Sequence, residues 1–306
     1  MNNISKDILQ QVSDLHNVPR AGIFNIRENG KLLARNTDNE VQIISKTNTD
    51  GIDVIIAPNT KNKSIHIPVI VTIAGMQDKV LNDFIIGDNC DILIVAGCGI
   101  HNTSDKVSSH NGIHSFHIGN NCNVKYVEKH IGIGDSNSSK VLNPITEIYM
   151  DSNSTFQMDT VQLSGVTSST RKTTAVVGEN STLLINEKIQ TNNSDYAKTD
   201  FKVTLKGNNS KVEVVSRAVA QGNSKQHFNS NIIGKTKCFG HVECDGILCD
   251  KAQISSTPKI VANSTDAILV HEAAIGKISE EQQNKLMTLG LTKEQSEETI
   301  LKGFLK

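Results

Sequence analysis

"FHIGNNCNVKYV" (residues 116–127) carries the pattern that decides the fold. Two apolar residues lead into a polar corner of Gly, Asn and Asn, and alternating apolar residues follow the corner. Gly and Asn tolerate the positive φ angles of a tight turn, and alternation with a period of two is typical of a β-strand. The stretch therefore predicts a strand, a tight turn and a second strand.

The same phrase recurs along the chain. Further copies are "FIIGDNCDILIV" (84–95), "IYMDSNSTFQMD" (148–159), "AVVGENSTLLIN" (175–186), "VTLKGNNSKVEVV" (203–215) and, more weakly, "NIIGKTKCFGHVEC" (231–244) and "IVANSTDAILVH" (260–271). The corner residues Gly87, Gly119, Ser152, Gly178, Gly207 and Gly234 are 32, 33, 26, 29 and 27 residues apart. A period of roughly 20–50 residues indicates a solenoid, a propeller or another repeat array.

The segments between the strands favour a solenoid. They contain no helical pattern, which argues against βαβ units, and the aromatic marks of propeller blades are missing. Trp is absent and aromatic residues make up only 4% of the chain, so the core must rely on β-branched side chains. We therefore predict an all-β core over residues 31–276, coiled as a β-helix. A β-sandwich with Asn-Gly turns remains the alternative.

Both ends of the chain differ from the middle. Residues 4–16 space their apolar side chains as a helix does, which predicts a short helix within an N-terminal segment, residues 1–30. Residues 277–306 contain two capping patterns, Ser279 with Gln282 and Thr292 with Gln295, which predict two short C-terminal helices. Such helices either cap the open end of a solenoid or bind a partner.

Composition limits the classes of partner and compartment. The chain has 306 residues, 31 basic and 32 acidic, with a net charge of −1 and no basic cluster, so we expect no nucleic-acid or membrane partner. The first residues lack the basic and apolar regions of a signal peptide, so we expect none, and six cysteines are too few for a disulfide scaffold. We expect free thiols in a cytoplasmic protein.

Two groups of residues are chemical candidates. In "GHVECDGILCD" (240–250), Cys244 and Cys249 would point to opposite faces of a strand and lie about 16 Å apart, too far to bind one ion. His271 follows Cys244 by 27 residues, about one coil, so the two could be close within a chain or line a face at a dimer seam. Together with Glu272 they would make a mixed ligand set for iron or zinc. A buried core cysteine is the alternative reading of Cys244.

The second group lies at residues 96–132. It combines Cys98 with five of the ten histidines, His101, His110, His114, His117 and His130. Such a density suits metal binding or general-base chemistry. The same residues could instead lie on the surface and at the corners of two adjacent coils.

Longer motifs resemble one known family. The run "GHVECDGILCDKAQISSTPKIVANSTDAILVHEAAIGKISEEQQNKLMTLGLTKEQSEETILKGF" (240–304) resembles the signature of the SufB/SufD family, scaffold subunits of the SUF iron–sulfur cluster assembly machinery. Residues 66–102 and 112–130 resemble short SufB-like proteins of archaea and anaerobic bacteria. The resemblance implies a right-handed parallel β-helix whose C-terminal helices bind a SufC-type ABC ATPase. The apolar residues expected at that docking surface are Leu286, Met287, Leu289, Ile300, Leu301 and Phe304.

The resemblance also implies individual roles. Cys244 matches the interface cysteine of the SufB type, His271 falls where the SufD type has an interface histidine, and Glu272 matches a neighbouring glutamate. Cys98 occupies the place of a cysteine that receives sulfur, although the proline that follows it in the family is missing here. His130 takes the place of a glutamine that lines the tunnel.

The function implied is that of a scaffold without turnover chemistry of its own. Because one chain carries both the SufB-like cysteine and the SufD-like histidine, we expect a homodimer that builds a transient iron–sulfur cluster at its interface. ATP would act through the partner ATPase, a cysteine desulfurase or another donor would supply sulfur, and a flavin as electron source is left open. The alternatives are a metal-dependent β-helix enzyme that uses the Cys/His cluster at 98–130, and a structural or regulatory paralogue without cluster binding.

Overall fold

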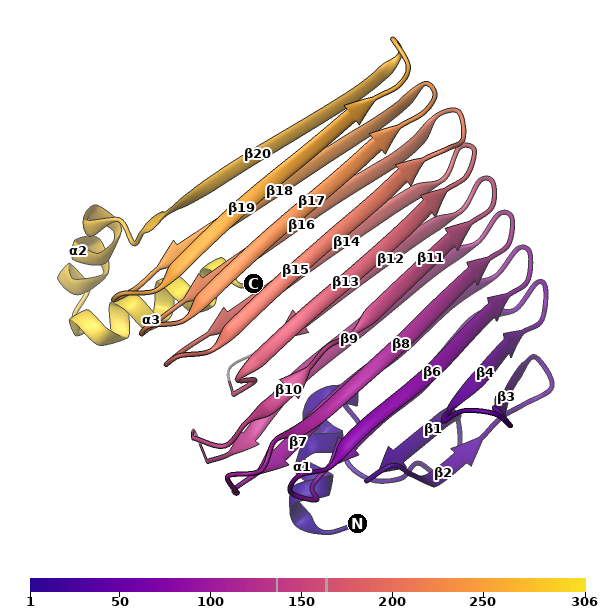
Figure 1. Cartoon of the computed structure of the whole chain (residues 1–306), viewed down its shortest axis with the longest axis horizontal. Coiled ribbons are helices and arrows are strands. Elements are labelled where there is room, and N and C mark those ends of the chain that lie inside the picture. Colours follow the sequence, from indigo (N-terminus) through magenta and orange to yellow (C-terminus); the bar gives the residue numbers. More distant parts are fainter. Residues whose placement is uncertain (136, 163–164) are drawn as a thin grey trace.

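A computed structural model of the chain is a β-solenoid of about 8 turns, with one helix before it and two after it (Figure 1). The structure describes residues 1–135, 137–162 and 165–306. Through most of the chain a strand pairs with the strand two places further on, not with the next one, as in β5–β7–β9 and β4–β6–β8. The predicted all-β solenoid is therefore confirmed, and the β-sandwich is excluded.

Consecutive strands alternate between two sheets, named here sheet A and sheet B. Sheet A contains β2 (Lys31–Asn36), β1 (Ile23–Glu28), β5 (Lys61–Val71), β7 (Asp91–Asn102), β9 (Asn123–Gly134), β12 (Thr155–Gln162), β14 (Thr182–Thr191), β16 (Ser210–Ala220), β18 (Cys238–Leu248) and β20 (Ala267–Lys277), in spatial order. Sheet B contains β3 (Val41–Ser45), β4 (Gly51–Ile56), β6 (Gln77–Ile86), β8 (Ser108–Ile118), β10 (Lys140–Leu142), β11 (Ile145–Met150), β13 (Ser168–Val177), β15 (Tyr196–Leu205), β17 (Lys225–Gly234) and β19 (Gln253–Ala262). The pairs β1–β2 and β3–β4 are antiparallel, and the others are parallel.

The recurring corner forms a ladder of asparagines. Asn89, Asn121, Asn153, Asn180 and Asn209 all have a φ between 52° and 59°. Amide side chains link neighbouring corners: Asn121 Nδ2 donates to Asn89 Oδ1 over 3.1 Å, and Asn209 Nδ2 donates to Asn180 Oδ1 over 3.1 Å. Because Asn tolerates the left-handed conformation and carries both a donor and an acceptor, it suits the corner and the ladder together.

The residue after each corner Asn faces inward and is Cys or Ser. At Cys122 and Ser154 the thiol or hydroxyl donates to a backbone carbonyl of the preceding corner, Cys122 Sγ to Gly87 O (3.1 Å) and Ser154 Oγ to Gly119 O (2.7 Å), whereas Ser210 donates to Gly207 O within its own corner (2.7 Å). Cys90 bonds to Ala57 O in the same way. Cys90 and Cys122 therefore stand where other coils use Ser, and their role is structural.

The interior is apolar near the asparagine corners. The rings of Phe84 and Phe116 stack with centroids 4.4 Å apart, and Phe156 lies 5.1 Å from Phe116. Such ring pairs contribute about 0.5–1.5 kcal/mol beyond their buried area. Further along the strands, away from these corners, the inward side chains become polar.

Helix α1 (Asn3–Ser13) covers the outer face of sheet A beside β5, β7 and β9. Its buried Ile8 and Val12 lie on Gly99 and Gly97, and a Cβ at Gly99 would be 2.3 Å from Ile8 Cγ2. These two glycines flank Cys98 on β7 and lie on the outer face beneath the helix. Because side chains alternate along a strand, the Cys98 side chain points inward. The predicted N-terminal segment 1–30 thus contains the helix and also β1, the first strand that joins β5 in sheet A.

Helices α2 (Glu280–Thr288) and α3 (Lys293–Phe304) begin at the predicted caps. The Ser279 side chain accepts from the Gln282 N–H, and Thr292 forms a capping box with Gln295. Both helices lie beside the strand ends and leave the last coil uncovered (Figure 1), so they do not cap the solenoid. Within the described part of the chain, no helix is both long and apolar enough to cross a bilayer.

Replacing Asn121 tests the ladder. We expect Asn121→Ala to lower the free energy of unfolding by about 1–3 kcal/mol. Alanine is strained at positive φ and cannot form the side-chain hydrogen bond to Asn89. Asn121→Gly removes the same bond without the strain and should cost about 1 kcal/mol less. Urea unfolding followed by circular dichroism measures both values, and equal stability of the two variants would contradict the strain argument.

Candidate functional site

A column of buried polar side chains runs along the inner face of sheet A. Because the strands are in parallel register, Glu128 stands beside Thr160, Thr160 beside Glu187, Glu187 beside Ser216, and Ser216 beside Cys244. All five are at most 2% exposed.

A second, shorter column lies two residues further along the strands and contains Cys98, His130 and Gln162. These eight residues of both columns are called the polar row. It joins Cys98 on β7 to Cys244 on β18 across five strand spacings, about 24 Å.

Arg171 on β13 contacts the two glutamates of this row, Glu128 and Glu187, and the three residues form its charged centre. Its guanidinium bonds to the Glu128 carboxylate, and its Nε lies 3.7 Å from Glu187 Oε1. Burial opposes ionisation of Glu128, but Arg171, His130 and His114 together hold the pKa of Glu128 below its usual value. Burial raises the pKa of Glu187 above its usual value despite Arg171. The ionised pair is therefore Glu128 with Arg171, while Glu187 keeps its proton to higher pH than a free glutamate.

Hydrogen bonds fix which nitrogen of two buried imidazoles carries the proton. Tyr126 donates its only hydroxyl proton to Glu128 Oε1 (2.9 Å), so His114 Nδ1, 2.8 Å from the same hydroxyl, is the donor and His114 Nε2 an acceptor. Arg171 can only donate, so His130 Nδ1, at 3.2 Å, accepts and His130 Nε2 carries the proton. Burial lowers the pKa of His114 to about 4 and of His130 to about 3, so both are neutral at pH 7.

Cys98 lines an enclosed cavity of about 10 Å³, roughly the space of one water molecule. The titratable residues that line it are Cys98, His110, His114, Glu128 and His130. Burial raises the pKa of Cys98 well above its usual value, and the charges of Asp78 and Glu128 add to the effect. Three of the five predicted histidines thus converge on Cys98. His101 and His117 occupy the outward positions of their strands and do not line this cavity.

Several buried polar atoms have no partner among the described residues: Thr160 and Gln162 belong to the row, and Thr146 and Thr173 stand side by side on sheet B. The hydroxyls of Thr146, Thr160 and Thr173 and the amide nitrogen of Gln162 are enclosed, yet none has a hydrogen-bond partner among the described residues. An unpaired buried polar group costs about 1–3 kcal/mol. Such groups are suited to bind water or a small polar species.

Cys244 lines a second small cavity at the other end of the row. The cavity measures about 10 Å³, and its polar lining includes Glu187, Thr199, Ser216 and Gln226. Thr199 and Ser216 donate to the two oxygens of Glu187, over 2.9 and 2.8 Å. Burial raises the pKa of Cys244 to about 11.

His271 and Glu272 occupy opposite faces of β20. His271 stands beside the inward-facing Val242, and Ala273, two residues later, stands beside Cys244. Cys244 and His271 therefore share the inner face. Burial lowers the pKa of His271, and its Nε2 is enclosed and has no hydrogen-bond partner in the part of the chain that the structure describes. Glu272 points outward, with its Oε1 3.6 Å from His241 Nε2. In the described ranges no three His, Cys, Asp or Glu side chains are placed to hold one metal ion, so Cys244, His271 and Glu272 are not a complete ligand set within one chain.

The comparisons with known proteins give the family of this chain. Residues 82–304 match the family model described as SUF system FeS cluster assembly, SufBD core domain. The chain belongs to the SufBD family. Membership implies involvement in iron–sulfur cluster assembly.

Three archaeal relatives carry the name iron–sulfur cluster assembly SufBD family protein. The protein of Methanothermobacter thermautotrophicus is 29% identical over 73% of this chain. Those of Archaeoglobus fulgidus and Pyrococcus horikoshii are 26% and 28% identical, each over 90% of this chain. The aligned parts cover 54%, 73% and 84% of the three relatives, so this SufBD chain spans about half the length of the first.

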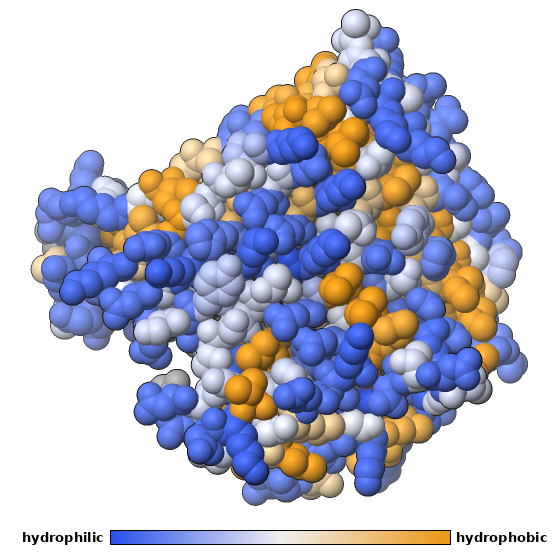
Figure 2. Space-filling view, viewed as in Figure 1, coloured by the Kyte–Doolittle hydropathy of each residue, from blue (hydrophilic) through white to orange (hydrophobic). Residues whose placement is uncertain are grey.

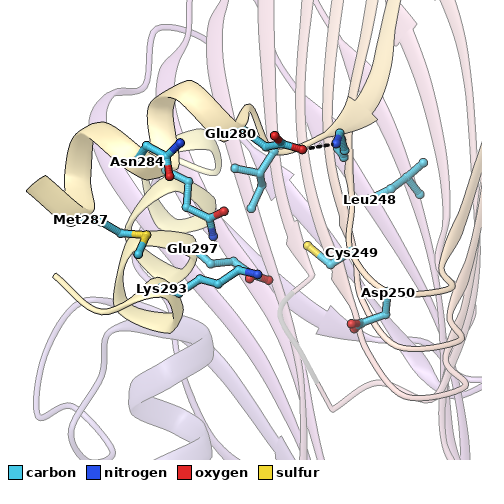
Figure 3. Close-up of a pocket in the computed structure, with 11 residues that line it drawn as sticks. Leu248, Cys249, Asp250, Glu280, Asn284, Met287, Lys293 and Glu297 are labelled. Carbon is cyan, nitrogen blue, oxygen red and sulfur yellow. Dashed lines mark hydrogen bonds and ion pairs between the residues drawn. The ribbon is translucent and has the colours of Figure 1, made fainter.

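The C-terminal helices of this SufBD chain border a groove of about 540 Å³ (Figure 3). Its lining includes Cys249, which lies one residue beyond the end of β18 and thus outside the predicted strand, whereas Cys244 lines the separate inner cavity. Burial raises the pKa of Cys249 to about 12, with a further contribution from Glu297.

The predicted docking residues differ in exposure. Met287 is 41% and Leu289 75% exposed, whereas Leu301 is only 6% exposed. Leu286, Ile300 and Phe304 are half-buried, and Phe304 lies under Arg217 at 6.0 Å. The most exposed of these apolar residues are therefore on α2 and just after it, while the C-terminal end of α3 contacts sheet A through Phe304 and Arg217.

Sequence reasoning missed the charged centre of the SufBD interior. Glu128, Arg171 and Glu187 were not among the predicted site residues, and neither was Asp78. A signal for part of it exists: Glu128, Thr160, Glu187 and Ser216 each follow a corner Asn by seven residues. Aligning the repeats on that Asn reveals the column.

Removing Arg171 tests the ion pair. Arg171→Met should lower the free energy of unfolding at pH 7 by about 3–5 kcal/mol, because Glu128 stays buried without its counter-charge. Burial would then raise the pKa of Glu128 in the folded variant, so protonation favours folding and the deficit should shrink as pH falls from 7 towards 4.5. Urea unfolding at pH 7 and pH 5 measures this change.

The matched control is Arg171→Met combined with Glu128→Gln. This double variant has no ionisable group at position 128, so it should recover at least about 2 kcal/mol at pH 7 and lose the pH-dependent difference. Equal stability of the single and double variants would refute the ion-pair interpretation.

Proposed function

We propose that this chain is a scaffold of a SUF-type assembly system, without turnover chemistry of its own. Sulfur enters at Cys98, moves through the solenoid along the polar row, and reaches Cys244. A nascent iron–sulfur cluster is built where two chains meet, with Cys244, His271 and Glu272 as its protein ligands. The observation that carries the proposal is the polar row itself, since it links the two cysteines through a solenoid whose other half is apolar.

The residues at the end of the row suit a cluster that is passed on. A cysteine thiolate is a soft ligand for iron, and few, mixed ligands hold a cluster less firmly than four cysteines do. Because the pKa of Cys244 is raised to about 11, iron must displace the thiol proton when it binds. The cluster is thus cargo, and a second chain is needed to complete its ligands.

The open last coil supports a homodimer. The strands β19 and β20, of 10 and 11 residues, are the final strands of their sheets and each has one edge without a partner among the described residues. Ile260, Ile268, Val270 and Ile275 are exposed there, and Figure 2 shows hydrophobic side chains gathered near this rim. Long apolar edge strands pair readily with another chain, and two identical edges pair about a twofold axis.

The exposed side of α2 supports a docking site for a SufC-type ABC ATPase. Met287 and Leu289 are apolar residues of the kind that a partner buries. ATP would act only through that partner, which can shift the dimer between two states by its differential affinity for them. A cysteine desulfurase or another persulfide donor would supply sulfur, and the reducing cytoplasm, where thiols stay free, is the compartment proposed.

Anaerobic reconstitution with ferrous iron and sulfide tests the ligand assignment. The chain should gain a brown chromophore, and Cys244→Ser should reduce bound iron and visible absorbance at least about tenfold, because a hydroxyl is a poor ligand for iron in a cluster. Cys249→Ser is the control and should retain the full signal. Full cluster loading of Cys244→Ser would remove Cys244 from the site.

Capture of the partner ATPase tests the docking surface. The intact chain should retain a SufC-type ATPase on an affinity column, and Leu289→Asp with Met287→Asp should weaken retention at least tenfold, because a charge cannot be buried there without a partner. Leu32→Asp, an exposed apolar residue at the opposite end of the solenoid, is the control. Unchanged capture by the α2 variant would overturn this assignment.

A further inference from the structure

Asp78 and His110 form a buried pair that lies outside the polar row. His110 Nδ1 is 2.7 Å from Asp78 Oδ2, and the two residues are 5% and 4% exposed. Arg27 lies 3.3 Å from the other Asp78 oxygen. Burial opposes ionisation of Asp78, but His110 and Arg27 hold its pKa below the usual value. An ionised carboxylate only accepts, so His110 Nδ1 donates to it, and in the neutral imidazole His110 Nε2 carries the lone pair.

That lone pair faces the Cys98 cavity. Cys98 on β7, His110 on β8 and Gly112 all line it. A Cβ at position 112 would lie 3.2 Å from His110 Nε2 and 3.0 Å from His114 Nε2, so both nitrogens lie beside Gly112 at the cavity wall. Glycine keeps that space open for a small group.

The other titratable groups around the cavity are already engaged. His114 Nε2 accepts from Asn82 over 3.4 Å, His130 Nε2 carries a proton, and Glu128 is paired with Arg171. The ionisable groups that face His110 and Cys98 are Arg27, Asp78, His114, Glu128 and His130, with Tyr126 and Arg171 behind them. Among the described residues no lysine or arginine lines the cavity to stabilise a thiolate, so the Cys98 thiol needs a base.

We infer that His110, oriented by Asp78, is the proton acceptor that converts the Cys98 thiol into the attacking thiolate. This inference deepens the proposed function and rests on Cys98 as the point of sulfur entry. Asp78 is the positioning residue, because it fixes the His110 tautomer and stabilises the imidazolium. The arrangement of thiol, imidazole and carboxylate is that of an activated nucleophile.

The step transfers one sulfur atom without net oxidation. His110 Nε2 takes the Cys98 proton, and the thiolate attacks the outer sulfur of a persulfide donor, R–S–SH. A new S–S bond forms at Cys98 while the S–S bond of the donor breaks, and its electron pair leaves on R–S⁻. The imidazolium proton returns to that thiolate, giving R–SH and a Cys98 persulfide. In the described chain no hydrogen bond joins Cys98 directly to His110, and the cavity has room for one water to carry the proton.

The test measures the reactivity of Cys98 in the full chain. Methyl methanethiosulfonate, a small thiol reagent, is added between pH 6 and pH 10, and labelling of the Cys98 peptide is followed by mass spectrometry. The chain should react at pH 7, whereas His110→Gln and Asp78→Asn should react at least tenfold more slowly at pH 7 and regain rate as pH rises. His117→Gln is the control, since His117 faces outward on the same strand, and it should react like the unchanged chain.

A structural role would give a different result. If His110 only supported packing, His110→Gln would change the melting temperature without moving the pH profile, and that outcome would overturn the inference. An unreactive Cys98 in the unchanged chain at pH 7 would overturn it as well, because an activated thiol must react.

A second probe separates this inference from the proposed function. Inorganic polysulfide is added, the chain is unfolded in alkylating agent, and the Cys98 persulfide is quantified. A base-dependent reaction with the thiol reagent but no persulfide would retain the role of His110 and reject Cys98 as the sulfur entry point. Persulfide formation at equal rates in His110→Gln and the unchanged chain would keep Cys98 as the sulfur entry point and reject the role of His110.

Discussion

Parallel, in-register stacking of the coils is the constraint on which the rest of the structure depends. Each strand of a sheet places its side chains directly beside those of the coils before and after it. A polar residue that faces inward therefore has equivalent neighbours along the solenoid axis and not only across the interior. In the corner this creates the asparagine ladder, and seven residues later it creates the column that ends at Cys244. The same rule builds the scaffold and the candidate site.

The polar and apolar halves of the interior have opposite effects on the free energy of folding. Buried carboxylates, imidazoles and unpaired hydroxyls cost free energy, and a buried ion pair seldom repays its desolvation. The apolar half, with its stacked rings and branched aliphatic side chains, offsets this cost within the same coils. Arg171 limits the cost further, because one guanidinium contacts both Glu128 and Glu187 from the opposite sheet. An interior chosen for stability alone would not need the charged half, so its presence is an argument for function.

Local signals in the sequence predicted most of the fold. The corner phrase specifies its own turn, and the capping patterns at Ser279 and Thr292 specify where the C-terminal helices begin, since both depend on neighbouring residues only. The spacing of Cys244 and His271 correctly indicated one inner face, but the coil length sets them two positions out of register. Alternation along β20 already implied that Glu272 points away from His271. The pairing of Arg171 with Glu128 crosses from one sheet to the other, and no local pattern encodes which strands face one another across the interior.

The two ends of the solenoid give the polar row a direction. At the N-terminal end the antiparallel strands β2 and β3 interrupt the parallel stacking, and α1 covers the outer face beside Cys98. At the C-terminal end stacking stops at β19 and β20 with no such reversal, and both helices there lie to the side. The row therefore begins near the end with the antiparallel strands and reaches Cys244 only one strand before β20, the last strand of sheet A. In the proposed function, sulfur that moves along the row reaches a second chain at that edge, so the proposed assembly site and the proposed dimer interface coincide.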